Sequence, residues 1–179
     1  MGSSVKVYVS KLEIGPKGPF IMLSRSHYGF VKRLLEIEIP ELSDGTVMLY
    51  SVARDAGSRT KIAVYTEYNN VDPLGAVIGE KGRRIGAVLK ELNGEKIDVV
   101  LYDKDPVKFI ANALSPAKDL KVTIKDENKK EALALANDSN LSLAIGKKGQ
   151  NVKLASRLTH YKIEVKSESA VQEEPVSEE

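Results

Sequence analysis

A short motif framed by glycines occurs twice in this chain, and its repetition constrains the fold more than any other feature. Gly-Glu-Lys-Gly at 79–82 recurs as Gly-Lys-Lys-Gly at 146–149. Upstream of the motifs, Leu74-x-x-x-Ile78 matches Leu141-x-x-x-Ile145 at the same separation. Because order, spacing and apolar flanks all repeat, the pattern favours an internal duplication over chance. We therefore expect two copies of one folding unit.

The apolar pattern around the first motif predicts the order helix, strand, strand, helix, helix, strand. Asp72-Pro73 supplies an N-cap followed by a residue suited to the first helical position, and Asn93-Gly94 ends the longer helix. Apolar residues at helical spacing indicate the helices. The predicted elements cover 27–36, 47–52, 61–66, a short helix from 72, 82–92 and 96–102.

The second copy repeats this order and has lost one residue after its motif. Asp105-Pro106 again provides an N-cap and a first helical residue. Only residues 103–105 link the copies, so we expect one rigid two-domain body. The predicted elements of this copy cover 105–113, 120–125, 130–135, 139–145, 149–158 and 161–166.

The two ends of the chain differ from the repeats. Residues 1–24 contain two apolar runs separated by the Gly/Pro-rich segment 15–19, which predicts a β-hairpin. One hairpin alone is marginally stable, so we interpret 1–24 as the end of a larger β-domain. Residues 167–179 hold five glutamates and no Lys or Arg, which predicts a disordered acidic tail. Without those five glutamates the net charge rises from +2 to +7.

A Gly-x-x-Gly turn that opens a helix is suited to binding phosphate. Glycine lets another backbone approach closely, and the free N–H groups of a helix N-terminus attract anions. The motif lysines add cationic charge, and the apolar residue before each motif is placed to line a groove under bases. The predicted nucleic-acid contacts are Ile78, Gly79, Glu80, Lys81, Gly82, Arg83, Arg84, Ile145, Gly146, Lys147, Lys148, Gly149, Gln150 and Asn151.

Two such loops, each between helices that follow two strands, are typical of KH domains, whose loop clamps about four nucleotides. We therefore predict an α/β (α+β) protein with tandem type II KH domains at 25–103 and 104–166. Each would have the order αββααβ, with a three-stranded sheet packed by helices. Residues 1–24 would precede them as the hairpin, and 167–179 would follow as the tail.

Other chemistries find no support in the sequence. The chain has no cysteine and two histidines, and it lacks the P-loop and dinucleotide fingerprints. We see no catalytic carboxylate pair, so we predict a binding protein and not an enzyme, with no metal and no cofactor. No apolar run approaches the ~20 residues of a membrane helix, so no membrane partner is expected.

Several residues keep two interpretations at this point. Tyr50, Tyr65 and Tyr68 either stack on bases or belong to a half-buried sheet. Arg54 and Arg59 either contact phosphate or flank a solvated hairpin tip. The remaining cases are His27 and His160, which suit capping or surface roles, and Lys153 and Arg157, which either extend the basic track or lie on an exposed helix face.

Residues from about 24 to 165 resemble the paired KH region of the NusA family of bacterial transcription factors. The resemblance lies in Leu-Ser-Arg-Ser-His at 23–27, Lys-Ile-Ala-Val-Tyr at 61–65, Val-Asp-Pro-Leu-Gly at 71–75, Phe-Ile-Ala-Asn-Ala-Leu-Ser-Pro-Ala at 109–117 and Leu-Ser-Leu-Ala-Ile-Gly-Lys-Lys-Gly-Gln-Asn at 141–151. The hairpin before residue 24 looks like the last strands of the OB-fold RNA-binding module that precedes the KH pair in this family.

The absence of cysteine fits a reducing cytoplasm, and we expect a monomer. The resemblance implies a factor that acts in elongation, termination and antitermination. Its implied partners are single-stranded nascent RNA, RNA polymerase (mainly through regions outside this chain) and other antitermination factors. Carried over, both loops together with Gln150 and Asn151 become RNA contacts. Glu80 departs from a phosphate clamp, so we expect the second loop to bind better. The alternative is a ribosome-associated structural or assembly protein built from type II KH domains.

Overall fold

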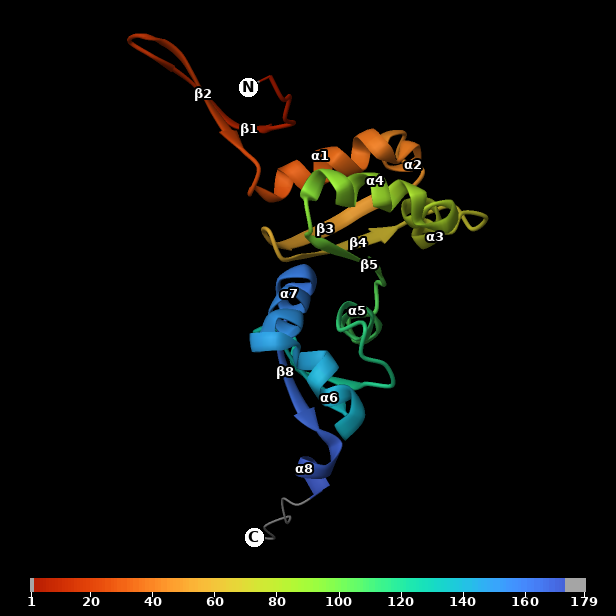
Figure 1. Ribbon diagram of the computed structural model, residues 1–179. Helices are drawn as coiled ribbons and strands as arrows, with labels where there is room; N and C mark the ends of the chain where they lie inside the picture. Colours follow the sequence, from red (N-terminus) through yellow and green to blue (C-terminus); the bar gives the residue numbers. More distant parts are fainter. Residues whose placement is uncertain (1, 173–179) are drawn as a thin grey trace.

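A hairpin and two similar α/β units follow one another along the chain in the computed structural model, which describes residues 2–172 (Figure 1). The hairpin consists of β1 (Tyr8–Gly15) and β2 (Gly18–Ser24), which pair antiparallel. It projects away from the two units (Figure 1). The predicted hairpin is therefore confirmed, although its first strand begins at Tyr8 and not within the alternating run at 5–7. The larger part of the chain forms the two units.

The first unit contains three helices of more than one turn, a single extra turn and a three-stranded sheet. The extra turn, α2, was not predicted: Pro40 starts it after Ile39, whose extended backbone ends α1. Asp72 caps α3 through its side chain, as predicted. The elements are α1 (Tyr28–Glu38), α2 (Pro40–Ser43), β3 (Met48–Asp55), β4 (Arg59–Tyr65), α3 (Pro73–Ile78), a 3-10 turn (Glu80–Gly82), α4 (Arg83–Leu92) and β5 (Lys96–Leu101).

The second unit repeats these elements without the counterpart of α2. Asp105 caps its first helix and Asn137 caps the short helix before the second loop. The elements are α5 (Pro106–Ala113), β6 (Lys121–Asp126), β7 (Glu131–Ala136), α6 (Asp138–Ile145), a 3-10 turn (Lys147–Gly149), α7 (Gln150–Thr159), β8 (Lys162–Ser167) and α8 (Glu168–Gln172).

The two sheets have the same topology. Their orders are β3-β4-β5 and β6-β7-β8, with an antiparallel pair followed by a parallel pair in each. In each unit the last strand lies at a sheet edge, and the short helix before the glycine loop packs beside it. The predicted αββααβ order and fold class are confirmed.

The hydrophobic cores show how the units are joined. One cluster lies inside the first unit, between its helices and one face of its sheet, and includes Val31, Leu35, Ile62 and Val64. A second cluster crosses the boundary, because Ala53, Ala63 and Val100 of the first sheet pack with α5 and α7 of the second unit. In Figure 1, α5 and α7 lie directly against the first sheet. The second unit therefore covers the outer face of the first sheet.

The start of the predicted acidic tail is corrected by the structure. Ser167 ends β8, and Glu168–Gln172 form the short helix α8. The hydroxyl of Ser167 donates to Asp138 Oδ1 at 2.6 Å, and Lys121 lies 3.2 Å from the carboxylate of Glu168. These contacts offset the ordering cost that composition alone had implied. The rest of the predicted tail, 173–179, lies outside the described residues.

Candidate nucleic-acid interface

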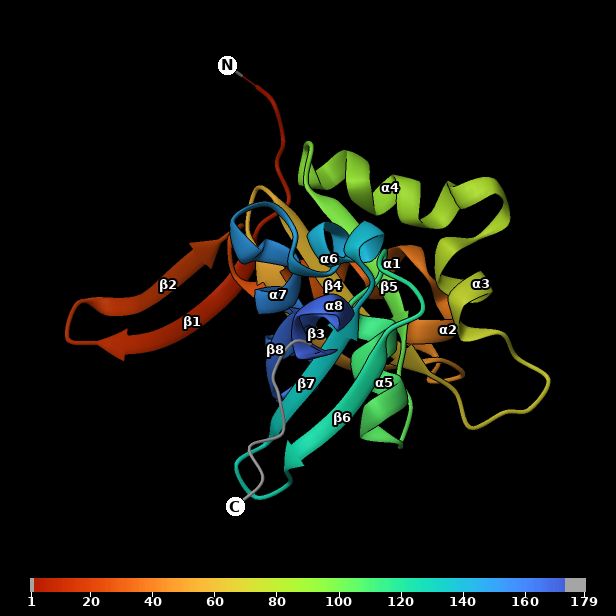
Figure 2. The same ribbon diagram turned by 90° about the horizontal axis from the view of Figure 1, so that it is seen from below.

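Both glycine loops have the same backbone conformation. The first glycines, Gly79 and Gly146, have φ/ψ of 74°/169° and 75°/169°. Lys81 and Lys148 follow at 51°/28° and 54°/27°, both in the left-handed region. The closing glycines also agree, at 74°/17° and 73°/15°. The duplication seen in the sequence is therefore a duplication of loop geometry. Figure 2 shows the sharp bend that the first loop makes between α3 and α4.

Each loop needs glycine at its first position for two reasons: the dihedral angles of that residue, and the close approach of the helix that follows. A Cβ on Gly146 would lie 2.7 Å from Cβ and 2.8 Å from the backbone nitrogen of Asn151. A Cβ on Gly79 would meet the side-chain carbons of Arg84 at 2.7–3.0 Å. Each loop thus folds tightly onto the start of the following helix, leaving its middle residues outside.

The four middle residues of the two loops are exposed. In the first loop they are Glu80 and Lys81, one of each charge, whereas in the second they are Lys147 and Lys148. Each loop leads into a ten-residue helix, α4 or α7, whose N-terminal N–H groups have no partner within the helix. The second loop therefore presents two cations together with a helix N-terminus, an arrangement that suits an anion.

Two predicted contact residues have internal partners instead. Arg84 and Asn151 occupy equivalent positions on α4 and α7, and both donate back to the preceding short helix. Arg84 Nη1 lies 2.8 Å from Ala76 O and 2.8 Å from Glu41 Oε2. Asn151 is 4% exposed, and its Nδ2 donates to Leu114 O and Ala144 O at 3.0 Å each. Their geometry is that of structural residues.

Gln150 and Arg83, a second equivalent pair, also differ in surroundings. Gln150 Nε2 donates to Asp55 Oδ2 and to Ser58 Oγ, both at 2.7 Å, and so ties the second loop to the β3–β4 turn of the first unit. Arg83 is exposed and lines a polar hollow that also includes Glu38 and Glu80. Arg84 also lines this hollow, so its two arginines are offset by two glutamates, which reduces the positive potential beside the first loop.

An elongated groove runs from the first unit onto the second. Leu74 of α3 and residues 99–101 of β5 form one side, and the end of α5 with the segment after it forms the other, giving a hollow of about 530 Å³. The second-unit residues that line it, which sequence reasoning missed, are Ala111, Asn112, Ser115, Ala117, Lys118, Asp119 and Leu120. No local spacing signals them, because they reach the groove only through the packing of one unit on the other.

The isoleucines expected in a groove floor differ in exposure. Ile78 is 40% exposed at the end of α3, next to the first loop, while Ile145 is half-buried. Ile78 shares a helix face with Leu74 at i, i+4, and Leu74 lines the groove. The structure therefore brings Ile78 close to the groove of the first unit.

The arginines of the β3–β4 hairpin are held in internal ion pairs. Arg54 forms a two-pronged pair with Glu95 at 2.8 and 2.9 Å, with both side chains almost completely buried. Burial alone would raise the pKa of Glu95, but hydrogen bonds from Arg54, Thr60 and the Gly57 N–H hold it below its ordinary value. Arg59 pairs with Asp98 at 2.8 Å. Neither arginine is directed to a phosphate site.

Two of the three tyrosines and His27 have structural roles, whereas Tyr68, Lys153 and Arg157 are exposed. Tyr50 stacks on Tyr102 with ring centroids 3.8 Å apart, and Tyr65 meets both rings edge-on, so these tyrosines belong to a packed aromatic cluster. The Nδ1 atom of His27 accepts from Gly29 N at 3.0 Å and caps α1. His160 ends α7 as an exposed residue with a left-handed backbone.

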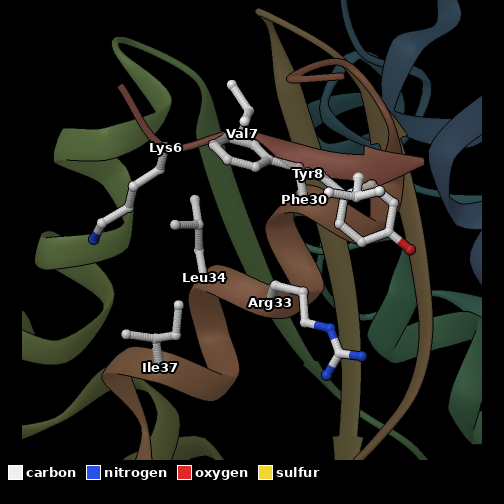
Figure 3. Close-up of a pocket in the computed structure, with 8 residues that line it drawn as sticks. Lys6, Val7, Tyr8, Phe30, Arg33, Leu34 and Ile37 are labelled. Carbon is white, nitrogen blue, oxygen red and sulfur yellow. The ribbon is translucent and has the colours of Figure 1, made fainter. Parts of the chain in front are cut away.

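The hollow drawn in Figure 3 is separate from both loops. Lys6, Val7 and Tyr8 of the N-terminal segment and Phe30 and Leu34 of α1 line it. None of the residues predicted to bind nucleic acid lines this hollow. Within residues 2–172 no group of three or more His, Asp or Glu could hold a metal ion, and none of the helices there is long and apolar enough to cross a membrane.

Fold and loops together define a tandem KH protein. Comparison with known proteins agrees: residues 25–102 match a family model described as the NusA-like first KH domain, and 106–173 match the NusA-like second KH domain. The transcription termination/antitermination protein NusA of Halalkalibacterium halodurans is 53% identical over 169 residues, covering 94% of this chain and 44% of that protein. The chain therefore belongs to the NusA family.

Further relatives support the same assignment. NusA of Bacillus subtilis is 53% identical over 94% of this chain and 45% of that protein, and NusA of Thermus thermophilus is 47% identical over 90% and 42%. The chain thus spans less than half the length of these relatives. The crystal structure of APE1850 has a TM-score of 0.55 and 24% identity over 75% of this chain and 96% of that one, which supports the fold alone. These matches do not favour the ribosome-associated alternative.

Proposed function

We propose that this chain binds single-stranded RNA through both KH units and has no catalytic role. The observation that carries the proposal is the matched geometry of the two loops, whose dihedral angles at the three positive-φ positions differ by no more than 3°. Each loop lies beside a short helix and an open strand edge, so a strand of RNA has a backbone clamp and a surface for its bases in each unit.

The second loop is the stronger clamp in this proposal. Both middle residues of this loop are exposed lysines, and neither is a carboxylate. A further lysine is close, because Lys153 Cε lies 3.7 Å from the position that a Cβ on Gly149 would occupy. In the first loop Glu80 opposes Lys81, and Arg84 is neutralised by Glu41. A carboxylate beside a phosphate is unfavourable, so we expect most of the loop-derived affinity to come from the second unit.

A pair of charge reversals tests the clamp. We expect Lys147→Asp with Lys148→Asp to abolish binding to an unstructured RNA in fluorescence anisotropy while circular dichroism stays unchanged. The matched control is Lys129→Asp with Lys130→Asp, another exposed lysine pair in the same unit, at the β6–β7 turn. Lys130 and Lys148 both have a φ of 54°, so each double variant places one of its two Asp residues at a left-handed backbone position. Equal losses in the two double variants would refute a clamp at the second loop.

Two properties of the bound RNA follow. Affinity should fall with salt, by about 0.7 log unit per log unit for each phosphate contacted on a single strand. The same sequence presented as a duplex should bind more weakly, because the bases that KH domains read are then paired. Equal affinity for single strand and duplex would contradict recognition through the grooves.

The wider role is also part of the proposal. Since the relatives are named as transcription termination/antitermination proteins, we infer that this chain contributes RNA binding to such a factor, acting with RNA polymerase in the bacterial cytoplasm as a monomer. Contacts with polymerase would lie mainly in regions outside this chain, and other antitermination factors are further partners in this proposal. Co-purification from cells should recover polymerase with a protein containing these units; recovery of ribosomal particles alone would contradict the assignment.

The domain division belongs to the same proposal, with KH domains at 25–103 and 104–166. Residues 1–24 are interpreted as the end of an OB-fold module. The support for that interpretation is a hairpin face made only of apolar side chains, which a larger β-module would cover. The large residues on this face are Val9, Leu12, Ile14, Ile21 and Leu23, all exposed. Limited proteolysis of a longer relative should leave the hairpin protected if it packs in such a module.

A further inference from the structure

A completely buried lysine lies at the junction of the two units. Lys61 on β4 has 0% exposure, and its Nζ donates to Asp98 Oδ2 at 3.0 Å and to Ser115 O at 2.8 Å. Lysine is almost never fully buried without a partner. Burial lowers the pKa of Lys61, and Asp98 opposes this shift. The first partner belongs to the same unit, whereas Ser115 belongs to the other.

The position of Lys61 is specific to the junction. It lies on the outer face of the first sheet, where Ala63 and Val100 join the core shared with the second unit. By strand register the equivalent residue of the second sheet is Leu133, whose partner on β8 is Glu164. The second copy therefore lacks this buried lysine, and the KH fold itself does not require it.

The carbonyl that Lys61 holds belongs to a wall of the groove. Ser115 lies in the turn after α5, and it lines the groove together with Ala117 and with Leu101 of β5. Asn112 Nδ2, in the preceding helix, donates to Leu101 O at 3.0 Å. This wall of the groove is thus attached to the first unit at two points: the end of α5 bonds to β5, and the turn after it bonds to Lys61 inside the sheet.

We propose that Lys61 is a positioning residue for RNA that crosses from one unit to the other. By holding the Ser115 turn against the first sheet, it sets the width of the groove at the boundary and the spacing of the two clamps. This inference rests on the proposed RNA-binding function. Two linked sites gain affinity only when their geometry permits simultaneous engagement, so a shift at this point would penalise long RNA selectively.

Lys61→Met tests the inference, because methionine keeps an unbranched chain and cannot donate. The probes are an RNA of about four nucleotides, which one loop clamps, and one of about ten, which reaches both. We expect about tenfold weaker binding of the long RNA and less than about twofold change for the short one. Lys32→Met, which removes an exposed lysine of α1, is the control for loss of charge and should leave both affinities unchanged.

Hydrogen exchange gives a readout that needs no RNA. The backbone amides of Ser115, Ala117 and Lys118 should exchange faster in Lys61→Met, with little change in the second loop. If that variant does not fold, Lys61→Leu introduces the residue type found at the equivalent position, Leu133, removes the same donor and should show the same dependence on RNA length. Unchanged exchange and an unchanged ratio of long to short affinity would overturn the inference, as would equal losses for both RNAs. Failure of the wild-type chain to bind either RNA would instead contradict the proposed function.

Discussion

Alanine at Gly146 should destabilise the chain much more than alanine at Gly149, although both glycines belong to one loop. At Gly146 the φ/ψ of 75°/169° is essentially restricted to glycine, which costs alanine about 1–3 kcal/mol. The new Cβ would also lie 2.7–2.8 Å from atoms of Asn151, including its backbone nitrogen. Overpacking of this kind adds about 1–3 kcal/mol. We therefore expect Gly146→Ala to lower the free energy of unfolding by about 4 kcal/mol.

Gly149 provides the matched control. Its φ/ψ of 73°/15° is the left-handed helical conformation, which costs alanine about 1–2 kcal/mol. The nearest atom to a Cβ there is Lys153 Cε at 3.7 Å, an ordinary contact. Gly79→Ala should fall between the two, because its Cβ would meet the side chain of Arg84, which can move more easily than a backbone.

Urea unfolding followed by circular dichroism measures all three variants. The expected order of destabilisation is Gly146 first, then Gly79, then Gly149. If Gly146→Ala and Gly149→Ala agreed within about 1 kcal/mol, the close approach of Asn151 would contribute nothing, and the tight packing of this loop onto α7 would be refuted.

Three further outcomes are expected. Asn151→Ala should cost about 2 kcal/mol in urea unfolding, since two buried carbonyls lose their donor; lost RNA affinity at full stability would contradict this structural role. Glu80→Lys should tighten RNA binding in anisotropy and steepen the salt slope by about 0.7; an unchanged slope would exclude a phosphate at the first loop. Glu95 has a lowered pKa, so its stabilisation is present above the ordinary carboxyl range and lost as pH falls. Glu95→Gln should therefore weaken the dependence of stability on pH in acid, and an unaltered acid transition would contradict this.

Much of the fold could be predicted because its signals are local. Asp72 and Asp105 cap helices in the structure as the sequence predicts, since an N-cap interaction involves only neighbouring backbone. The helix α8 escaped prediction for the opposite reason. It lies in an acidic segment, and its supporting contacts come from Asp138 and Lys121, far away in sequence.

In the candidate site, too, local features could be predicted and distant contacts could not. Repetition of the glycine motif was enough to locate both loops and to pair them residue by residue. Glu80 in the first loop showed that the two loops differ in charge. The same pairing assigned Arg84 and Asn151 to RNA, whereas in the structure both donate to the backbone of the short helix. Spacing identifies which residues are equivalent, but the direction of a side chain depends on what surrounds it.

The sequence by itself determined the duplication, the order αββααβ and the tight conformation of both loops, because each follows from apolar spacing, capping and the dihedral freedom of glycine over short stretches of chain. Only the tertiary structure decided that the second unit covers the first sheet, that Gln150 bonds to Asp55, and that Lys61 reaches Ser115. These contacts join residues far apart in the chain. Their free energy depends on burial and on the position of a partner that local sequence does not specify.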